Sequence, residues 1–298
     1  MRNILTFDVE DWQQSTLDFD LPVTTRVVDN TARILDLCAQ AGVHGTFFVL
    51  GLVAAAHPAL VRRIHDAGHE VASHGHDHRP VHAMTPETFR ADLRRSRGLI
   101  EQSMGGPVLG YRAPDFSIPS AALWALEVLA EEGYRYDSSL FPFAGPRYGI
   151  AEAFDAPCRV RTSAGDLLEF PLATTTWAGL RLPAVGGGYF RLFPYAYHAA
   201  AVRRLNLRAV PAVAYFHPYE VDTEEIPRSP HPIPLRMRLS QGVGRGRVAP
   251  RLLKLLREFA WGPASAWLGQ GAGTTAGRVL DLTGIRGGRA RWRTEMAT

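Results

Sequence analysis

Short β-like runs alternate with helix-like runs along most of the chain, and this alternation constrains the fold more than any other feature. Runs that suit strands lie at residues 4–9, 45–50, 70–74, 108–112, 134–138, 167–172 and 213–217. Helix-like stretches occupy residues 27–41, 58–67, 86–104, 120–132 and 196–205. Such alternation predicts a parallel α/β architecture, and periodicity does not choose between an open sheet and a barrel. A Rossmann fold is disfavoured because no G-x-G-x-x-G motif follows the first strand.

The length and composition fit one large α/β domain followed by a C-terminal extension. The chain has 298 residues, of which 46% are hydrophobic, so it can bury a sizeable core. We expect a main domain over residues 1–232 and an extension packed on it over residues 233–272, with a helix near residues 250–259. Residues 273–298 are rich in Gly, Thr and Arg and are expected to form a weakly ordered basic tail.

Basic residues are concentrated in the last quarter of the chain, although the net charge is only +4. The excess from Arg236 to Arg293 is either a solvated face or a surface for an anionic glycan, a lipid-linked sugar phosphate or a membrane. Nucleic acid is a poor partner for it because no binding motif accompanies the charge. Cys38 and Cys158 match no metal or redox spacing. With no signal peptide and no apolar run of membrane-spanning length, the sequence predicts a cytoplasmic protein.

Three acidic residues stand at the end of the first predicted strand, at Asp8, Glu10 and Asp11. Because side chains alternate along a strand, Asp8 and Glu10 should point the same way and converge on one ion or one water molecule. Solvated acids at a strand-to-loop transition are the alternative interpretation.

Three histidines follow the third predicted strand, at His74, His76 and His78. In a helical turn, His74 and His78 would project to one side and could share a cation, whereas His76 would face away. Neutral imidazole suits zinc and related divalent ions, so the pattern predicts a metal site, with Zn2+ favoured over Co2+, Ni2+ or Mn2+.

Further polar residues lie at other predicted strand ends. Arg112 precedes Pro114, where it could orient a carboxylate through paired hydrogen bonds. His217 follows an apolar run and precedes a proline, which predicts a position at the rim of the site. Asp137 and Glu169 also fall at strand ends, with less legible roles.

The ordered motifs resemble those of the polysaccharide deacetylases of the NodB-homology group over residues 3–222. The resemblance rests on Thr-Phe-Asp-x-x-Asp, Ser-His-Gly-x-x-His, Arg-x-Pro and a late strand ending in His. The forms Asp-Val-Glu-Asp-Trp and His-Pro-Tyr-Glu are similar to the branch encoded beside bacterial exopolysaccharide assembly genes, which also has a C-terminal extension. The resemblance implies a distorted barrel of about seven or eight strands and hydrolysis of N-acetyl groups from amino sugars by a metal-activated water.

The resemblance also implies roles for individual residues. Asp8 matches the general base, Arg112 the residue that holds the base, and His217 the general acid. His74 and His78 match the histidine pair that binds the metal. One departure concerns the acidic ligand, since the family has two adjacent acids whereas Val9 separates them here. Glu10 is favoured as the ligand because it shares the strand face of Asp8, with Asp11 as the alternative.

The expected partner is an N-acetylated glycan, either a polysaccharide or its lipid-linked or oligosaccharide precursor. A backbone N–H near Tyr111 could stabilise the oxyanion. The predicted substrate-binding residues are Tyr111, Pro114, Asp137 and Tyr189, and Trp12, Phe190 and Tyr219 are further candidates for stacking on sugar rings. An amidohydrolase acting on a small non-sugar amide and a non-catalytic glycan-binding protein are the alternative functions.

Overall fold

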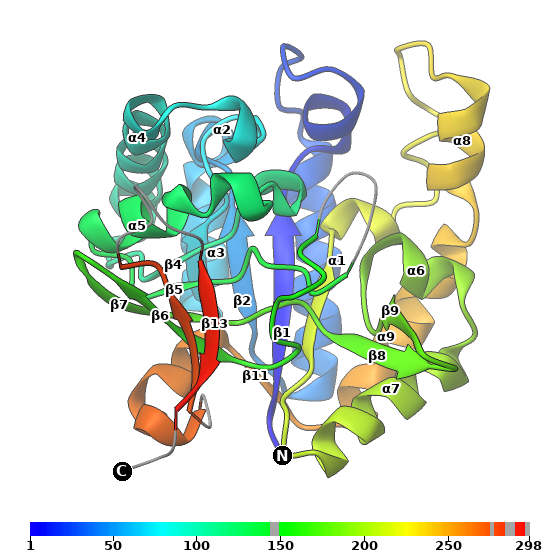
Figure 1. Ribbon diagram of the computed structural model, residues 1–298. Coiled ribbons are helices and arrows are strands. Elements are labelled where there is room, and N and C mark those ends of the chain that lie inside the picture. The colour runs from blue at the N-terminus through cyan, green and yellow to red at the C-terminus, as the bar shows by residue number, and fades with distance from the viewer. Residues whose placement is uncertain (144–148, 275–276, 284–289, 296–298) are drawn as a thin grey trace.

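A computed structural model describes residues 1–143, 149–274, 277–283 and 290–295. Its centre is an eleven-stranded sheet in the order β10-β1-β2-β3-β4-β5-β7-β6-β12-β13, with β11 also pairing with β1 (Figure 1). The strands are β1 Asn3–Val9, β2 Thr46–Val49, β3 Glu70–Ser73, β4 Gly110–Tyr111, β5 Tyr136–Asp137, β6 Cys158–Thr162, β7 Gly165–Glu169, β8 Thr174–Trp177, β9 Leu180–Pro183, β10 Val213–Phe216, β11 Trp261–Gly262, β12 Arg278–Asp281 and β13 Arg291–Thr294. The α-helices are α1 Arg26–Ala41, α2 Gly51–Ala56, α3 Pro58–Asp66, α4 Pro86–Met104, α5 Trp124–Glu131, α6 Gly187–Leu192, α7 Tyr195–Leu207, α8 Leu235–Gly242 and α9 Val248–Glu258.

The seven strands from β10 to β7 are parallel neighbours, and each corresponds to a strand predicted from the sequence. The α/β class is therefore confirmed. The sequence did not predict β6, the β8–β9 hairpin or the three strands β11, β12 and β13. Strands β8, β9, β11, β12 and β13 have two to four residues each, and β6 alternates buried and half-buried positions instead of forming the continuously buried run seen in β1 and β2.

Strand β1 carries the first part of the functional site, and its two faces have different surroundings. All seven of its residues are buried, as expected for a central parallel strand covered on both faces. Leu5, Phe7 and Val9 belong to the large apolar core shared with α1, α3 and α4. Ile4 belongs to a second cluster within the fold. Alternation therefore places Asp8 on the same inner face as Ile4.

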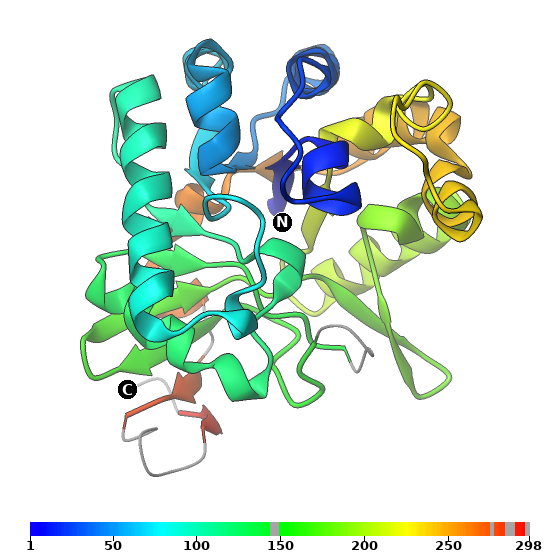
Figure 2. The same ribbon diagram turned by 90° about the horizontal axis from the view of Figure 1, so that it is seen from above.

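Helix α1 follows β1 and shows how the predicted elements are terminated. It ends at Gly42, whose φ of 66° is a left-handed conformation that a glycine adopts without a Cβ penalty. The helix buries Ile34, Leu35 and Cys38 in the large core and contacts α9 from the C-terminal region. Figure 2 shows the helices ranged around the outside of the central strands.

Strand pairing does not close the sheet into a barrel within the described residues. The gap beside β10 is instead crossed by irregular chain after β7, where the Leu172 N–H donates to Leu140 O at 3.0 Å and the Ala173 N–H donates to Val213 O at 3.2 Å. Pro171 interrupts this segment and has no N–H to donate to a strand ladder. The mostly parallel sheet is consistent with the predicted distorted (β/α)-barrel-like fold, and isolated hydrogen bonds, not strand pairing, span the gap beside β10 among the described residues.

The C-terminal region joins the main sheet instead of only packing on it. Strand β11 pairs with β1, and β12 runs parallel to β6 and pairs with β13. Val279, Leu280 and Leu282 are buried. Strands β12 and β13 lie within residues 273–298, for which weak order was expected, and that expectation stays a prediction. Residues 275–276, 284–289 and 296–298 of that predicted tail lie outside the described residues, and the predicted boundary at residue 232 stays a prediction.

Candidate metal centre and its cleft

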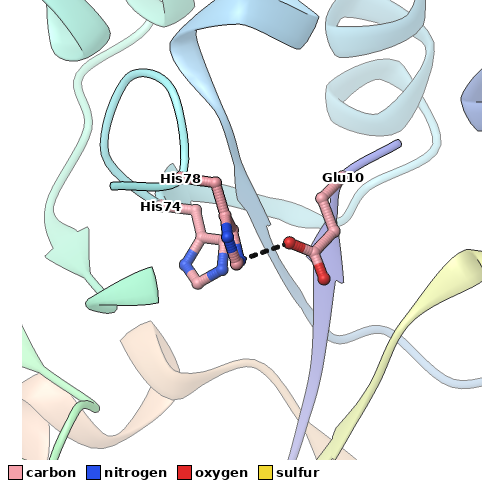
Figure 3. A group of neighbouring side chains, drawn as sticks. All are labelled: Glu10, His74 and His78. Atoms are coloured by element: carbon pink, nitrogen blue, oxygen red, sulfur yellow. Dashed lines mark ion pairs between the residues drawn. The ribbon is translucent and has the colours of Figure 1, made fainter. Parts of the chain in front are cut away.

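Three side chains from two strand ends converge at the carboxyl edge of the sheet. Glu10 directly follows β1, and His74 begins the loop after β3 that also carries His78. All three are buried, and one ligand atom from each lies within 4.8 Å of the others. Figure 3 shows the carboxylate and the two imidazoles pointing toward a common point. Among the described residues, this is the cluster whose donor atoms could hold one metal ion.

The donor set fits a divalent cation of the zinc type. Glu10 Oε2 lies 2.6 Å from His78 Nε2, so the carboxylate and this imidazole are in direct contact and their donor atoms are close enough to bind one ion. His74 Nδ1 lies 2.9 Å from the Arg112 carbonyl oxygen, which leaves Nε2 directed toward the cluster. One carboxylate and two imidazoles with an outer carbonyl partner are typical of a catalytic zinc centre.

The protonation of Glu10 and His74 suits metal binding, whereas burial acts to lower the pKa of His78 but the charge and contact of Glu10 raise it overall. Burial raises the pKa of Glu10, but the charges of His78, His217 and His74 and the contact with His78 outweigh it and lower the pKa to about 2. The carboxylate is therefore ionised at neutral pH. Burial lowers the pKa of His74 against the attraction of Asp8 and Glu10, which favours the neutral imidazole that a metal requires.

The loop that carries the histidines is not the helical turn expected from their spacing. Gly75 and His78 both have positive φ, of 77° and 66°, so the chain folds back between the two ligands. Such a conformation is unusual for a non-glycine residue and is typical of functional sites. The loop is held by the His76 N–H, which donates to both Asp92 carboxylate oxygens at 3.1 and 3.2 Å. His76 itself is buried away from the cluster, as predicted.

The two candidate acidic ligands have different surroundings. Glu10 lies in the cluster, whereas Asp11 accepts hydrogen bonds from the Gln13 N–H at 3.0 Å and from the Thr24 N–H at 2.8 Å. The Thr24 hydroxyl also donates to it. Asp11 therefore organises the turn after β1 and the start of the segment leading to α1, and Glu10 remains the candidate ligand.

A buried ion pair stands beside the cluster. Arg112 Nη1 donates to Asp8 Oδ1 at 2.8 Å and to Thr6 Oγ1 at 2.7 Å. Its Nε and Nη2 donate to the Ser138 carbonyl and hydroxyl oxygens at 3.0 and 2.8 Å. The guanidinium also lies 4.3 Å from the Phe48 ring centroid. A fully buried arginine is tolerated because these acceptors replace water, and they fix the direction of the Asp8 carboxylate.

His217 completes the group from the end of β10. Its Nε2 lies 3.4 Å from Glu10 Oε1 and 3.9 Å from Asp8 Oδ2, and its ring stacks on Tyr219 at 4.8 Å. Burial acts to lower the pKa of His217, but contact with Glu220 and the negative charges of Glu10, Glu220 and Asp8 raise the pKa to about 9. In the protein without a metal ion, His217 is therefore protonated at neutral pH.

Two residues that support His217 were not selected from the sequence. Glu220 Oε2 lies 3.4 Å from His217 Nδ1 and accepts from the His217 N–H at 3.1 Å. Glu220 Oε1 accepts from Arg191 Nε at 3.2 Å, and both side chains are buried. The His-Pro-Tyr-Glu motif carried the signal, since a residue three positions along a tight turn faces back to its start. No local pattern marked Arg191, which comes from the distant helix α6.

These groups open into one cleft of about 660 Å³. Asp8, Glu10, His74, His78 and His217 all line it, as do Tyr189 and Tyr219. Helix α8 forms part of its wall. The cleft is open to solvent and has space for a ligand, so it could hold one part of an extended molecule while the rest lies outside.

Four residues suggested as substrate or sugar contacts, Tyr111, Pro114, Trp12 and Phe190, are not among the residues that line the cleft. The side chain of Tyr111 is buried against Phe89, and Pro114 is also buried. Trp12 and Phe190, suggested for sugar stacking, lie in apolar clusters. These four side chains occupy the core behind the site, and their predicted contact with substrate stays a prediction. Tyr189 remains as a candidate.

Asp137 has a different role from the predicted one. It is fully buried opposite Glu169 on the neighbouring strand. Burial raises the pKa of both carboxyl groups, and the charge of Asp137 raises that of Glu169 further, which favours a protonated form of the pair. Ser139 Oγ donates to Asp137 Oδ1 at 2.6 Å and accepts from the Ala113 N–H at 2.8 Å. Asp137 thus supports the segment around Arg112 from behind and does not face the cleft.

Comparison with protein families matches two adjacent parts of the chain. Residues 4–136 match the family described as polysaccharide deacetylase, and residues 138–269 match a domain of unknown function, DUF3473. The first match contains Asp8, Glu10, Arg112 and both histidines of the cluster. His217, Glu220 and Arg191 fall in the second.

Curated proteins and solved structures are similar to the chain as well. A peptidoglycan deacetylase from Helicobacter pylori is 32% identical over 108 residues, covering 36% of each chain. A chitooligosaccharide deacetylase from Rhizobium leguminosarum bv. trifolii is 39% identical over 70 residues, covering 24% of this chain and 33% of its own. The chain thus spans little more than a third of these relatives. The crystal structure of a Mycobacterium smegmatis protein assigned to the polysaccharide deacetylases shares the fold, with a TM-score of 0.62, 24% identity and coverage of 90% and 88%.

No helix in the described part of the chain is long and apolar enough to span a lipid bilayer.

Proposed function

Because the chain carries a polysaccharide deacetylase domain over residues 4–136, we propose that it hydrolyses N-acetyl groups on amino sugars with a bound divalent metal ion. The observation that carries the proposal is the single cleft that joins a three-residue metal cluster, an oriented carboxylate and a protonated histidine. A structural metal site would not need the last two. A degenerate glycan-binding site would not be expected to keep all of them.

The metal would be held by Glu10, His74 and His78. When bound there, a divalent ion lowers the pKa of water and polarises the acetyl carbonyl group. Zinc suits this donor set best, and Co2+, Ni2+ or Mn2+ are compatible with it.

The chain's own residues supply the proton transfers. Asp8, held by Arg112 at 2.8 Å, is oriented to accept a proton from water as the carbonyl carbon is attacked. His217, whose Nε2 lies 3.4 Å from Glu10 Oε1, would donate a proton to the departing amine. General acid and base groups of this kind each contribute roughly 10²–10⁴-fold to the rate. Arg112 acts through Asp8 and is a positioning residue.

The substrate proposed is an N-acetylated polysaccharide or a lipid-linked or oligosaccharide precursor of one. The peptidoglycan and chitooligosaccharide deacetylases among the relatives act on glycans that contain N-acetylglucosamine, which supports this class. Tyr189 and Tyr219 line the cleft and offer rings on which a sugar could stack. A small non-sugar amide is the second candidate, since the same groups would cleave it.

The proposal is tested with purified protein loaded separately with Zn2+, Co2+, Ni2+ and Mn2+. Acetate release is measured with N-acetylglucosamine oligomers, lipid-linked N-acetylated sugars and small acetamides, with His74→Ala as the matched control. We expect metal-dependent release from glycans and none from the variant. If acetate is released only from small acetamides, the proposed sugar substrate is wrong and a small amide takes its place. If the protein binds glycans but releases no acetate with any of the metals, the proposed catalytic activity is wrong.

A further inference from the structure

Helix α8 exposes a row of apolar side chains although it borders the cleft. Leu235, Leu239 and Val243 are 71%, 59% and 51% exposed, and no residue of α8 is buried. Large apolar side chains scattered singly on a surface need no explanation, but a continuous row does. These three residues are called the α8 apolar row below.

The spacing of the row defines an amphipathic surface. Residues four apart lie on one face of a helix, so Leu235 and Leu239 share one face of α8, and Val243 follows directly after the helix ends at Gly242. Met237 lies on the opposite side and packs against the cluster around Tyr219. Two exposed arginines flank the row on either side, at Arg236 and Arg238.

The helix is held in this orientation by two buried arginines at its C-terminal end. Arg191 Nη1 donates to the carbonyl oxygens of Ser240, Gln241 and Val243 at 3.3, 2.8 and 3.2 Å. Arg245 Nε donates to the Gln241 carbonyl oxygen at 2.8 Å. These cationic caps satisfy the last carbonyl groups of the helix. The apolar row therefore points outward because α8 is anchored.

The position of α8 links the row to the site. In Figure 1, α8 projects at the top of the molecule, on the side to which β1 points and where the strand ends carry the metal cluster. Arg236, Met237, Ser240 and Gln241 line the cleft. A surface that contacts the α8 apolar row would therefore lie beside the mouth of the cleft.

The charge around the row favours an anionic partner. Arg236 and Arg238 are exposed beside the row, and no Asp or Glu lies between residues 226 and 257 of the sequence. An apolar stripe edged by arginines is typical of helices that lie in the headgroup region of anionic membranes, where the arginine stems cover apolar surface and their charges reach the phosphates.

A second copy of the chain is a weaker occupant. Symmetric pairing through the α8 apolar row would bring Arg236 and Arg238 of the two copies near one another, which is unfavourable. Three side chains also bury far less than the roughly 1,200 Å² of a stable interface.

We infer that α8 docks the protein on an anionic lipid surface through Leu235, Leu239 and Val243, with Arg236 and Arg238 at the headgroups. The inference concerns binding and stands independently of the proposed deacetylase activity. If the proposed deacetylase activity holds as well, docking would favour a lipid-linked glycan as substrate, because the cleft would then open beside the lipid headgroups.

The test is co-sedimentation of the purified chain with vesicles of mixed phosphatidylglycerol and phosphatidylcholine, and with vesicles of phosphatidylcholine alone. We expect binding to the anionic vesicles that weakens as salt is raised. The double variant Leu235→Gln/Leu239→Gln should lose about tenfold or more in partition, since burial of one leucine side chain is worth about 1.5–3 kcal/mol when complete. Arg238→Gln should reduce the preference for anionic over neutral vesicles.

The matched control is Leu207→Gln, because Leu207 is the last residue of α7, which lies at the bottom of Figure 1 whereas α8 lies at the top, and it is 88% exposed. Sedimentation equal to wild type is expected, and all variants should release acetate from soluble oligomers at the wild-type rate, which separates docking from catalysis. Equal vesicle binding by the double variant and the control, or no binding by wild type, would overturn the inference. A wild-type dimer in light scattering that the double variant lacks would assign the row to a second copy instead.

Discussion

Replacing Glu220 by glutamine tests the most specific electrostatic feature of the site. The side chain keeps its size and can still accept a hydrogen bond from the His217 N–H, now at 3.1 Å. What it loses is the negative charge 3.4 Å from His217 Nδ1. Arg191 keeps three carbonyl acceptors in α8 and its segment, so the fold should survive the change.

The size of the effect follows from the surroundings of His217. A carboxylate within about 4–6 Å typically changes a pKa by about 1–3. Glu220 is one of three acids that raise the pKa of His217 to about 9, together with Glu10 and Asp8. Removal of one should lower that pKa by about 1–2 pH units, equivalent to about 1.4–2.7 kcal/mol. A metal on Glu10 would lower the starting value, but the difference between the two proteins should persist.

The sign is set by the role of the histidine. A general acid must be protonated, so activity is present below the pKa of His217 and is lost as pH rises through it. Glu220→Gln should therefore move the basic limb of the kcat/KM profile to lower pH. The assay is acetate release by metal-loaded protein, alongside NMR titration of His217 in metal-free protein.

Glu224→Gln serves as the matched control, because Glu224 is half exposed and pairs only with Arg228 among the described contacts. It should leave both limbs in place. If Glu220→Gln lowers turnover while the basic limb and the NMR titration stay where they are, Glu220 is merely structural. If the titration moves but the basic limb does not, His217 is not the acid.

Three further outcomes are expected from the cluster. His74→Ala and His78→Ala should each remove most of the bound metal and activity with little change in the melting temperature, and metal analysis showing one equivalent on the double variant would refute the assignment. Glu10→Ala should weaken metal binding more than Asp11→Ala does, as measured by titration calorimetry. Asp11→Ala should instead lower the free energy of unfolding, measured by chemical denaturation, by about 1–3 kcal/mol, because buried N–H donors lose their acceptor. Asp8→Asn should abolish turnover while retaining the metal, and substantial residual kcat would exclude it as the base.

The motif order in the sequence predicted the members of the site better than their geometry. Side-chain alternation grouped Asp8 with Glu10 and separated Asp11, because a strand has a fixed two-residue period. Asp8 and Glu10 both line the cleft and Asp11 does not, while the ligand role of Glu10 stays a prediction. The four-residue spacing of His74 and His78 predicted that their side chains converge, but it did so by assuming a helical turn, which the structure does not have there. The loop brings them together through positive φ angles, and spacing carries no information about such a backbone.

Contacts between distant segments lay beyond the sequence. Asp137 sits at a strand end like the site residues, yet it faces Glu169, because the pairing of β5 with β7 decides what lies opposite it. Arg191 reaches Glu220 only once α6 and the segment after β10 are packed together.

The sequence by itself determined the α/β class, the seven parallel strands and the groups available for chemistry, since these depend on short-range periodicity and residue type. Only the tertiary structure shows that strand pairing does not close the sheet among the described residues and that β12 and β13 join it. It also shows that Glu220 is the carboxylate that supports His217. These features depend on pairing between segments that can be more than 100 residues apart. The free energy of such pairing is set by burial and register across the whole fold, and no local window of sequence contains it.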